Sequence, residues 1–410
     1  MTPGIALEKG EHETVIVVAA TGGGIQAAAW TGNVLARLKE TFGDVPQFDR
    51  SVRLVSSVSG GSLGAMYFLH AYQNGALPSG PEELRSRIIE PAQASSLDAV
   101  TWGWLFQDQL RAFIPFGWEA TGLLANDRGL SLQKAWSERA SGIGNATLTS
   151  WRRDTAAGLR PAVIFNTTVV ETGQRLLLST TDLRKREKGC APRAAALSAS
   201  VGFYDLYPCS DITVPTAARL SATFPLVTPA ARIEQGGTCE RHNHVVDGGY
   251  YDNYGMSSLL EWLDIGLQQT SAIRNVIVLE IRSSPAAEAS PAEGKFGWFF
   301  QTGSALTTMA KVREDAQLAN NNRMLCMARR LWASKSVTIT SFPVVYRAPE
   351  QGAKPPSPPL SWHLTAEQKA NIERAADWAA QGVIRDVKSC FTNPQKCGEL
   401  ARNYDDACRN

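Results

Sequence analysis

Twice within its first seventy residues the chain repeats one pattern: an apolar run, a glycine-rich turn and a helix-like segment of small residues. The first unit is VIVVAATGGGIQAAAW from residue 15, and the second is VRLVSSVSGGSLGA from residue 52. A continuous apolar run is typical of a strand buried in a parallel sheet. Further strand candidates (AVIFNTTVV, RLLLST, HVVD and NVIVLEI) are followed by helical patterns at about 304–333 and 365–388. This order predicts a layered α/β domain with helices on both faces of the sheet.

Composition narrows the class of protein. The chain has 410 residues, enough to bury a large core, and 41 basic side chains nearly balance 39 acidic ones. That balance does not favour a nucleic-acid-binding protein. The seven cysteines form no CxxC pair and no zinc-ligand spacing, and we expect neither a metal nor a cofactor. They allow one or two disulfides, although we favour the reduced state.

Four serines stand where the second unit turns from strand to helix, at positions 56, 57, 59 and 62. A nucleophilic serine at such a turn needs small residues two positions before and after it, because the bend is crowded. Ser59 meets this requirement, with Ser57 before it and Gly61 after it. Ser62 also has glycines at both positions, but it falls inside the expected helix. We therefore predict Ser59 as the nucleophile and keep Ser62 as the alternative.

The turn of the first unit contains Gly22, Gly23 and Gly24. Consecutive glycines let backbone N–H groups point into one cavity, and the following helix N-terminus adds partial positive charge. Such a turn binds phosphate or stabilises an oxyanion. The spacing also fits a dinucleotide fingerprint, which requires an acidic residue at the end of the next strand. The next strand ends in SSVSGGS, so the oxyanion interpretation is favoured.

A third motif, VVDGGYYDNYG at 245–255, places Asp247 after an apolar strand and before two glycines. Open α/β sheets place their sites at strand ends of this kind. On its own, however, the pattern is more typical of an ordinary turn.

Together the three motifs resemble the patatin-like phospholipase family. The segments FNTTVVETGQ at 165–174, TAARLSATFPLVTPAAR at 216–232 and PLSWHLT at 359–365 are also similar to segments of that family. The resemblance covers roughly residues 13–390. It implies a three-layer α/β/α fold with a mostly parallel sheet. It also implies a lipid acyl hydrolase of the phospholipase A, lysophospholipase or esterase type, with a lipid or phospholipid as substrate.

The resemblance further implies a role for each motif. Ser59 is the nucleophile, and Asp247 takes its proton directly, without a histidine. The backbone N–H groups of Gly22, Gly23 and Gly24 form the oxyanion hole, and Gly60 is a further donor. An aspartate is a weak base, so it must be buried or in close contact to act on a hydroxyl.

Three positions depart from the family's pattern. Thr21 precedes the glycines where the family usually has aspartate or a small residue, and Ser57 stands where it has glycine. Gln26 replaces a basic residue, which changes how the loop is anchored or lowers its attraction for phosphate head groups. That loss favours the main alternative function, a catalytically weak or inactive lipid-binding or protein-binding module on the same fold.

A Ser-His-Asp esterase is the rival mechanism, with His244 or His363 as the histidine. For His363, near HLT, the simpler interpretation is a polar loop residue. If Asp247 is only part of a turn, Asp252 becomes the next candidate base. The basic run RKREKGCAPR at 184–193 is predicted to be a solvated loop, and the alternative is that it attracts anionic lipid.

We divide the chain into an N-terminal tail at 1–12, a catalytic domain at 13–390 and a cysteine-containing C-terminal tail at 391–410. Six Trp or Phe residues between 102 and 118 predict a cap, or a lid that faces lipid, near 99–125. Residues 14–36 are uncharged but interrupted by TGGG, which favours strand, turn and helix over a membrane span. With no visible signal peptide, we expect a cytoplasmic protein or one in peripheral contact with membranes.

Overall fold

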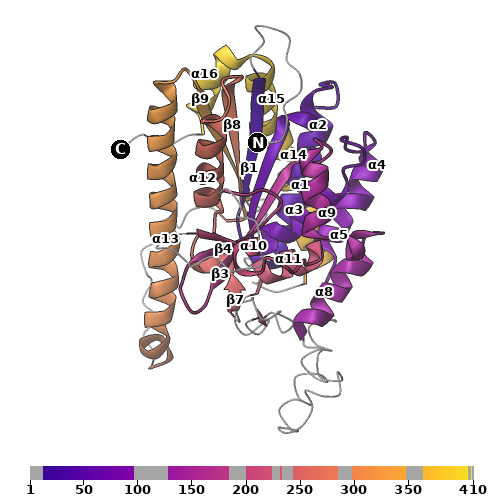
Figure 1. Ribbon diagram of the computed structural model, residues 1–410, viewed down its shortest axis with the longest axis vertical. Coiled ribbons are helices and arrows are strands. Elements are labelled where there is room, and N and C mark those ends of the chain that lie inside the picture. The colour runs from indigo at the N-terminus through magenta and orange to yellow at the C-terminus, as the bar shows by residue number, and fades with distance from the viewer. Residues whose placement is uncertain are drawn as a thin grey trace.

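The computed structural model describes residues 13–96, 128–183, 200–223, 231–232, 243–284, 298–347, 363–404 and 408. Figure 1 shows these residues as a sheet that runs through the centre of the molecule with helices on either side. The predicted cap at 99–125, the basic run at 184–193 and the tail at 1–12 lie outside the described residues.

Within the described residues, one nine-stranded sheet has the order β5-β4-β3-β2-β1-β8-β9, with β7 pairing β3 and β6 pairing β7. Its strands are β1 (Glu13–Ala20), β2 (Val52–Val58), β3 (Ala162–Val169), β4 (Arg175–Ser179), β5 (Ser200–Gly202), β6 (Ala231–Arg232), β7 (His244–Asp247), β8 (Ile273–Arg282) and β9 (Thr338–Val345). The pairs β1–β2, β1–β8, β2–β3, β8–β9 and β4–β5 are parallel. Only β3–β4, β3–β7 and β6–β7 are antiparallel. The sheet is therefore mostly parallel, as predicted.

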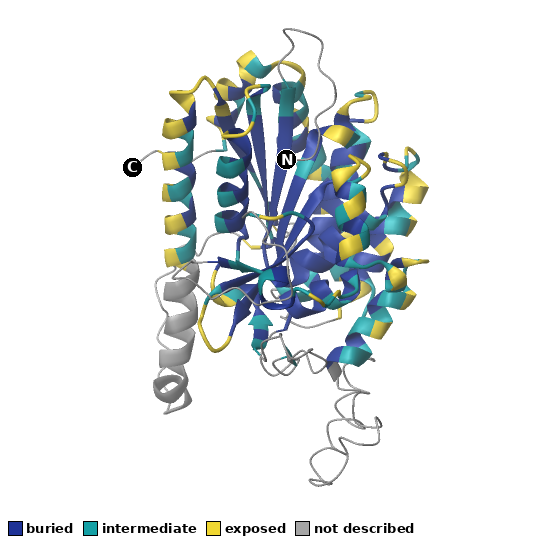
Figure 2. Cartoon of the chain, viewed as in Figure 1, coloured by how far each residue is buried: buried dark blue, intermediate teal, exposed yellow. Residues whose placement is uncertain are grey.

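The central strand β1 shows why the fold has three layers. Successive side chains of a strand point to opposite faces of a sheet. Ile16 and Val18 join one large core cluster, whereas Val15 and Val17 join a second cluster on the other face. Because both faces are covered, the strand is apolar throughout rather than alternating. Figure 2 shows the central strands as almost uniformly buried.

Two sets of helices cover the two faces. The first core cluster takes side chains from α1 (Gly24–Thr41), α3 (Gly60–His70), α14 (Ala366–Gln381) and α15 (Val383–Thr392). The second takes them from α12 (Met256–Leu267) and α13 (Trp298–Ala333), which lie to the left of the sheet in Figure 1. The shorter elements are α2 (Phe48–Ser51), α4 (Pro81–Leu84), the π-helix η1 (Arg85–Ile89), α5 (Glu90–Gln93), α8 (Arg128–Glu138), the 3₁₀ turns η3 (Ile143–Asn145), η4 (Gly248–Tyr250) and η5 (Pro394–Lys396), α9 (Leu148–Ala156), α10 (Phe203–Leu206), α11 (Val214–Ser221) and α16 (Cys397–Ala401).

Several local predictions are confirmed. Both strand–turn–helix units form, as β1–α1 and β2–α3, and the hairpin between β3 and β4 turns at Gly173 with a φ of 67°. The helical pattern at 365–388 forms two helices rather than one, because Gly382 breaks it with φ −108° and ψ −106°. No helix in the described part of the chain is both long and apolar enough to cross a membrane.

The C-terminal region packs on the domain rather than extending from it. The predicted boundary at residue 390 falls within α15, and Cys397 and Ala401 of α16 are buried in the first core cluster. The structure forms the disulfides Cys390–Cys397 and Cys326–Cys408. The reduced state favoured from the sequence is therefore wrong, because spacing along the chain does not show that Cys326 and Cys408, 82 residues apart, meet in the fold.

Candidate active site

Ser59 occupies the sharp turn between β2 and α3. The residue has φ 51° and ψ −125°, one of three non-glycine residues with positive φ among those described. A side chain in such a conformation costs of order 1–3 kcal/mol and persists only where the surroundings enforce it. In strand-to-helix turns of this kind the strained backbone exposes the side-chain hydroxyl of a nucleophilic serine. Ser59 is 7 % exposed, so its side chain sits in a confined part of the surface.

The glycines after Ser59 are required by close backbone contacts. A methyl group at Gly60 would stand 1.8 Å from the carbonyl oxygen of Gly24, and one at Gly61 would stand 2.5 Å from that of Thr21. The turn of the second unit is thus pressed against the turn of the first. Sequence analysis attributed the glycines to a crowded bend, and the structure shows that the crowding comes from the other motif.

The other serines of the motif are inward and already bonded. Ser56 donates to the carbonyl oxygen of Gly255 at 2.7 Å, and Ser57 is fully buried with a contact of 3.4 Å to the carbonyl oxygen of Ile164. Ser62 is fully buried within α3, and its hydroxyl lies 3.1 Å from that of Ser57. Ser57 therefore fits in place of glycine because it faces inward, and the enclosed Ser62 is a poor alternative nucleophile.

A buried serine of α11 supports the turn from behind. The hydroxyl of Ser221 accepts the backbone N–H of Ser59 at 3.1 Å and donates to the carbonyl oxygen of Asn166 at 2.6 Å. The hydroxyl of Ser62 lies 2.8 Å from the same group. Asn166 of β3 also donates its side-chain amide to the carbonyl oxygen of Ser57 at 2.9 Å. Both supporting residues lie in segments similar to the family, at 165–174 and 216–232, but sequence analysis assigned neither a role because each is far from the serine motif along the chain.

The glycine loop between β1 and α1 is anchored to the end of β8. Gly23 and Gly24 have φ of 138° and 58°, conformations that side chains disfavour. Ser283 donates its backbone N–H to the hydroxyl of Thr21 at 3.0 Å and its own hydroxyl to the carbonyl oxygen of Gly22 at 2.6 Å. Gln26 donates its amide to the carbonyl oxygen of Ser283 at 2.8 Å. Thr21 and Gln26, which depart from the family's pattern, thus both help to anchor the glycine loop to Ser283, and this anchor needs no cation.

The expected oxyanion donors differ in whether their backbone N–H groups already have an acceptor. The N–H of Gly22 donates to the carbonyl oxygen of Asn253 at 3.0 Å. Gly24 and Gly60 are the first residues of α1 and α3, where backbone N–H groups have no intrahelical acceptor and the helix end is partially positive. A methyl group at Gly60 would stand 3.1 Å from the nitrogen of Gly24, so the two helix N-termini converge. This convergence makes a site suited to a developing negative charge.

Asp247 lies at the end of β7, opposite Thr167 of β3. Its side chain is almost fully buried, at 2 % exposure, and one carboxylate oxygen accepts the N–H of Gly249 at 2.7 Å. The next residue packs tightly, because a methyl group at Gly248 would come within 2.2 Å of the carbonyl oxygen of Asn166. The DGG motif is therefore a tight turn that holds a buried carboxylate.

Two asparagines connect the DGG turn with the other motifs. The carbonyl oxygen of Asn166 accepts from Ser221, which supports Ser59, and packs against Gly248. The side-chain oxygen of Asn253 would meet a methyl group at Gly22 at 2.3 Å and one at Gly249 at 2.9 Å. The three motifs predicted to form the site thus gather around one end of the sheet.

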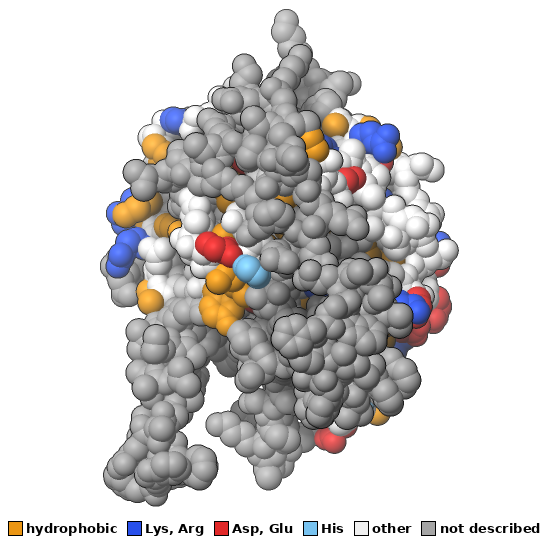
Figure 3. All heavy atoms as spheres, turned by 60° about the horizontal axis from the view of Figure 1, so that its bottom comes forward, with side chains coloured by type: hydrophobic (Ala, Val, Ile, Leu, Met, Phe, Trp, Pro, Cys, Tyr) orange, Lys and Arg blue, Asp and Glu red, His pale blue; other side chains and the backbone are white. Residues whose placement is uncertain are grey.

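The histidines described in the structure have other partners. His244 contacts Glu171 through Nδ1 at 2.6 Å, and both side chains are substantially exposed. Figure 3 shows the lower face of the molecule, on which a histidine and an acidic side chain lie beside hydrophobic ones. His363 contacts the hydroxyl of Ser95 at 3.0 Å. His70 contacts the carbonyl oxygen of Ser141, and its burial lowers the pKa of the imidazole.

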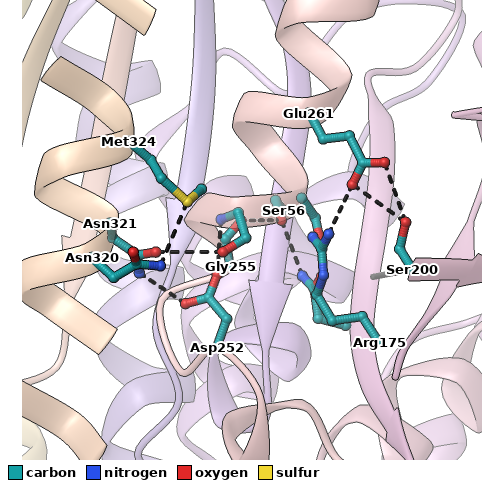
Figure 4. A network of polar contacts seen from close by, with 12 residues as sticks. Ser56, Arg175, Ser200, Asp252, Gly255, Glu261, Asn320, Asn321 and Met324 are labelled. Atoms are coloured by element: carbon teal, nitrogen blue, oxygen red, sulfur yellow. Dashed lines mark hydrogen bonds and ion pairs between the residues drawn. The ribbon is translucent and has the colours of Figure 1, made fainter. Parts of the chain in front are cut away.

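A buried polar network holds the loop that follows Asp247 (Figure 4). Asp252 accepts the backbone N–H groups of Tyr254 at 3.0 Å and Ser257 at 2.8 Å, and the side-chain amide of Asn321 at 2.9 Å. Because both of its oxygens are engaged in fixing this loop to α12 and α13, Asp252 is a poor substitute base.

The network continues toward the sheet edge. Arg175 donates to the hydroxyl of Ser258 at 2.7 Å and to Glu261 at 2.8 Å, and Ser258 donates to Asn166 at 2.6 Å. Among the described residues, no cluster of three or more His, Cys, Asp or Glu side chains could hold a metal ion.

The fold and the turn define an α/β protein with a mostly parallel central sheet and a strained serine at a strand-to-helix turn. A family model described as patatin-like phospholipase matches residues 19–260, and the chain belongs to this family. Membership supports lipid hydrolase activity in general. No match is found among the curated proteins.

Solved structures resemble the chain at low identity. VipD from Legionella pneumophila is 12 % identical, with a TM-score of 0.31, over 92 % of this chain and 67 % of that one. Human GIVD cytosolic phospholipase A2 is 13 % identical, with a TM-score of 0.40, over 92 % and 63 %. Full-length ExoU from Pseudomonas aeruginosa, solved in complex with SpcU, is 14 % identical, with a TM-score of 0.26, over 78 % and 53 %. The chain thus spans between about half and two thirds of these proteins.

Proposed function

We propose that this protein hydrolyses carboxylic esters of lipids through a dyad of Ser59 and Asp247. The hydroxyl oxygen of Ser59 attacks the ester carbonyl while its proton passes to the carboxylate of Asp247. The N–H groups of Gly23, Gly24 and Gly60 hold the oxyanion. The alcohol then leaves with the proton, and water hydrolyses the acyl-serine by the reverse use of the same groups.

The observation that carries this proposal is the strained conformation of Ser59 beside two converging helix N-termini. Strain of this kind is expected where a hydroxyl must be presented to a substrate. Ser57, which lies two residues earlier and faces inward, has no positive φ. The buried Asp247 is the carboxylate that the family resemblance assigns as base. The substrate class, a lipid or phospholipid, also rests on family membership, as does the proposed peripheral contact with membranes.

The test compares Ser59→Ala with Ser334→Ala, which removes an exposed hydroxyl at the end of α13. We expect a fluorophosphonate probe to label the unmodified protein and Ser334→Ala but not Ser59→Ala. Loss of the nucleophile should lower ester hydrolysis on the order of 10⁴-fold or more. Fatty acid release from a panel of phospholipids and neutral esters then defines the substrate.

Two results would contradict the proposal. Unaltered labelling of a folded Ser59→Ala protein would move the nucleophile elsewhere. A correctly folded unmodified protein that is neither labelled nor active on any ester would instead favour the binding module. Circular dichroism on each protein shows that it is folded.

A further inference from the structure

Asn253 lies in the loop between η4 and α12, at the meeting point of the three motifs. A methyl group at Gly22 would stand 2.3 Å from the side-chain oxygen of Asn253 and 3.1 Å from the Cβ atom of Ser59. A methyl group at Gly249 would stand 2.9 Å from the same side-chain oxygen and 3.0 Å from Oδ1 of Asp247. The carboxamide oxygen therefore lies near both the predicted nucleophile and the predicted base.

The backbone of Asn253 is fixed on both sides. Its N–H donates to the side-chain oxygen of Gln317 at 3.0 Å, and its carbonyl oxygen accepts the N–H of Gly22 at 3.0 Å. Gln317, from α13, also donates to the carbonyl oxygen of Tyr251 at 2.9 Å. The position of the residue is thus set by its backbone and by α13.

The side chain, by contrast, is uncommitted. Among the residues that the structure describes, none forms a hydrogen bond with the carboxamide of Asn253, which is only partly buried. A carboxamide offers two donors and one acceptor, and it can turn either end toward a ligand. A polar group held rigidly beside a nucleophile with no partner of its own is available to a substrate.

The engaged N–H of Gly22 indicates what the carboxamide does. That donor is expected in the oxyanion hole from the family resemblance, yet it is bonded to the carbonyl oxygen of Asn253. The residue that occupies this donor also places its carboxamide beside Gly22, with the side-chain oxygen nearest, and turning the carboxamide over brings its N–H₂ to that position. A side-chain amide donor of this kind is an established component of oxyanion holes in other serine hydrolases.

We propose that Asn253 is a catalytic residue whose side-chain N–H₂ donates a hydrogen bond to the oxyanion. The proposal rests on the proposed function. When the oxygen of Ser59 bonds to the ester carbon, the carbonyl electron pair moves to the carbonyl oxygen, and the serine proton moves to Asp247. The negative oxygen is then held by Nδ2 of Asn253 together with backbone N–H groups. When the tetrahedral intermediate collapses, this bond weakens and the alcohol leaves with the proton.

The test uses Asn253→Ala and Asn253→Asp, with Asn320→Ala as the matched control. Asn320 is an exposed asparagine of α13, and its side-chain amide donates to the sulfur of Met324 at 3.6 Å. We expect both Asn253 variants to lose about 10²–10³-fold in kcat on a short chromogenic ester, with KM changed by no more than a few-fold. Asn320→Ala should match the unmodified protein.

A second measurement separates a catalytic role from a structural one. A trifluoromethyl ketone forms a hemiketal with Ser59 and carries the same negative oxygen as the intermediate. Its affinity should fall about 10²-fold in Asn253→Ala. The melting temperature should stay near that of the unmodified protein, because no residue in the described part of the chain forms a hydrogen bond with this side chain.

The outcomes distinguish this inference from the proposed function. If the unmodified protein hydrolyses esters and Asn253→Ala matches it in kcat and in ketone affinity, the inference fails and the function stands. A rise in KM with kcat unchanged would likewise overturn it, since the residue would then bind substrate and oxyanion equally. If the unmodified protein neither hydrolyses esters nor binds the ketone, the proposed function and this inference fail together.

Discussion

The contact between Gly60 and Gly24 offers a demanding test of the site, because it can be disturbed without removing any donor. Gly60→Ala keeps the backbone N–H that we assign to the oxyanion hole. The new methyl group, however, would stand 1.8 Å from the carbonyl oxygen of Gly24. Real Cβ contacts are essentially never shorter than 3.0 Å, so the serine turn and the glycine loop must separate by more than an ångström.

The size of the effect follows from that displacement. Misplacing reacting groups by about 1 Å costs on the order of 10²-fold in rate. Overpacking of this kind also lowers the free energy of unfolding by about 1–3 kcal/mol. We therefore expect Gly60→Ala to lose at least 10²-fold in kcat/KM on a chromogenic ester and to melt at a lower temperature.

The control substitution is Gly398→Ala, in α16. A methyl group there would meet nothing within 4 Å, and alanine is favoured over glycine inside a helix by roughly 1 kcal/mol. This variant should keep full activity and equal or slightly higher stability. Activity of Gly60→Ala within a few-fold of the unmodified protein would show that the two motifs are not pressed together as described.

Three further predictions follow from single side chains. Asp247→Asn should lower ester hydrolysis nearly as far as loss of the nucleophile, because only the carboxylate accepts a proton. For the same reason the unmodified protein should lose activity as pH falls. If Asp247→Asn shows initial rates near those of the unmodified protein, the DGG motif is a structural turn and Asp247 is not the base. His244→Ala and His363→Ala should each hydrolyse esters at rates within a few-fold of the unmodified protein. If either variant is folded but inactive, the Ser-His-Asp mechanism is favoured instead. Glu373→Gln should lower stability at pH 7 by about 0.5–1 kcal/mol, measured by urea unfolding. Burial alone would raise the pKa of Glu373, but the hydrogen bonds and charge around it, led by the bond from Arg85, lower it below 4.5; its contribution is therefore present above pH 4.5 and should vanish as pH falls through the folded pKa. An equal loss in stability for Glu373→Gln at pH 3 would contradict that assignment.

Local sequence patterns were sufficient to predict the central strands of the layered fold. Continuous apolar runs predicted β1 and β2, because both faces of a three-layer sheet are buried. The strand β9 was not predicted, since Pro343 interrupts its apolar pattern. In the structure β9 pairs only with β8 among the described strands, and proline is tolerated on such an edge.

The supporting parts of the site could not be predicted in the same way. Ser221 lies 162 residues from Ser59, and Ser283 lies 262 residues from Thr21. Ser221 lies within the family-like segment at 216–232, but no pattern there assigns it a role, and nothing around Ser283 distinguishes that serine from others in the chain. Their roles depend on which strand ends the fold brings together, and that information is not local.

The glycines of the site illustrate the difference between composition and contact. In the sequence, the three motifs look independent, and each glycine has a local explanation as a turn residue. In the structure the missing side chains allow close contacts: Gly60 meets Gly24 and Gly22 meets Asn253 across motifs, Gly248 meets Asn166 of β3, and Gly249 makes room for Asn253 within its own motif. A small side chain at Gly22 or Gly60 would meet an atom of another motif and so separate the two motifs. The requirement for glycine is therefore a property of the assembled site, and substitutions at these positions should affect activity together rather than additively.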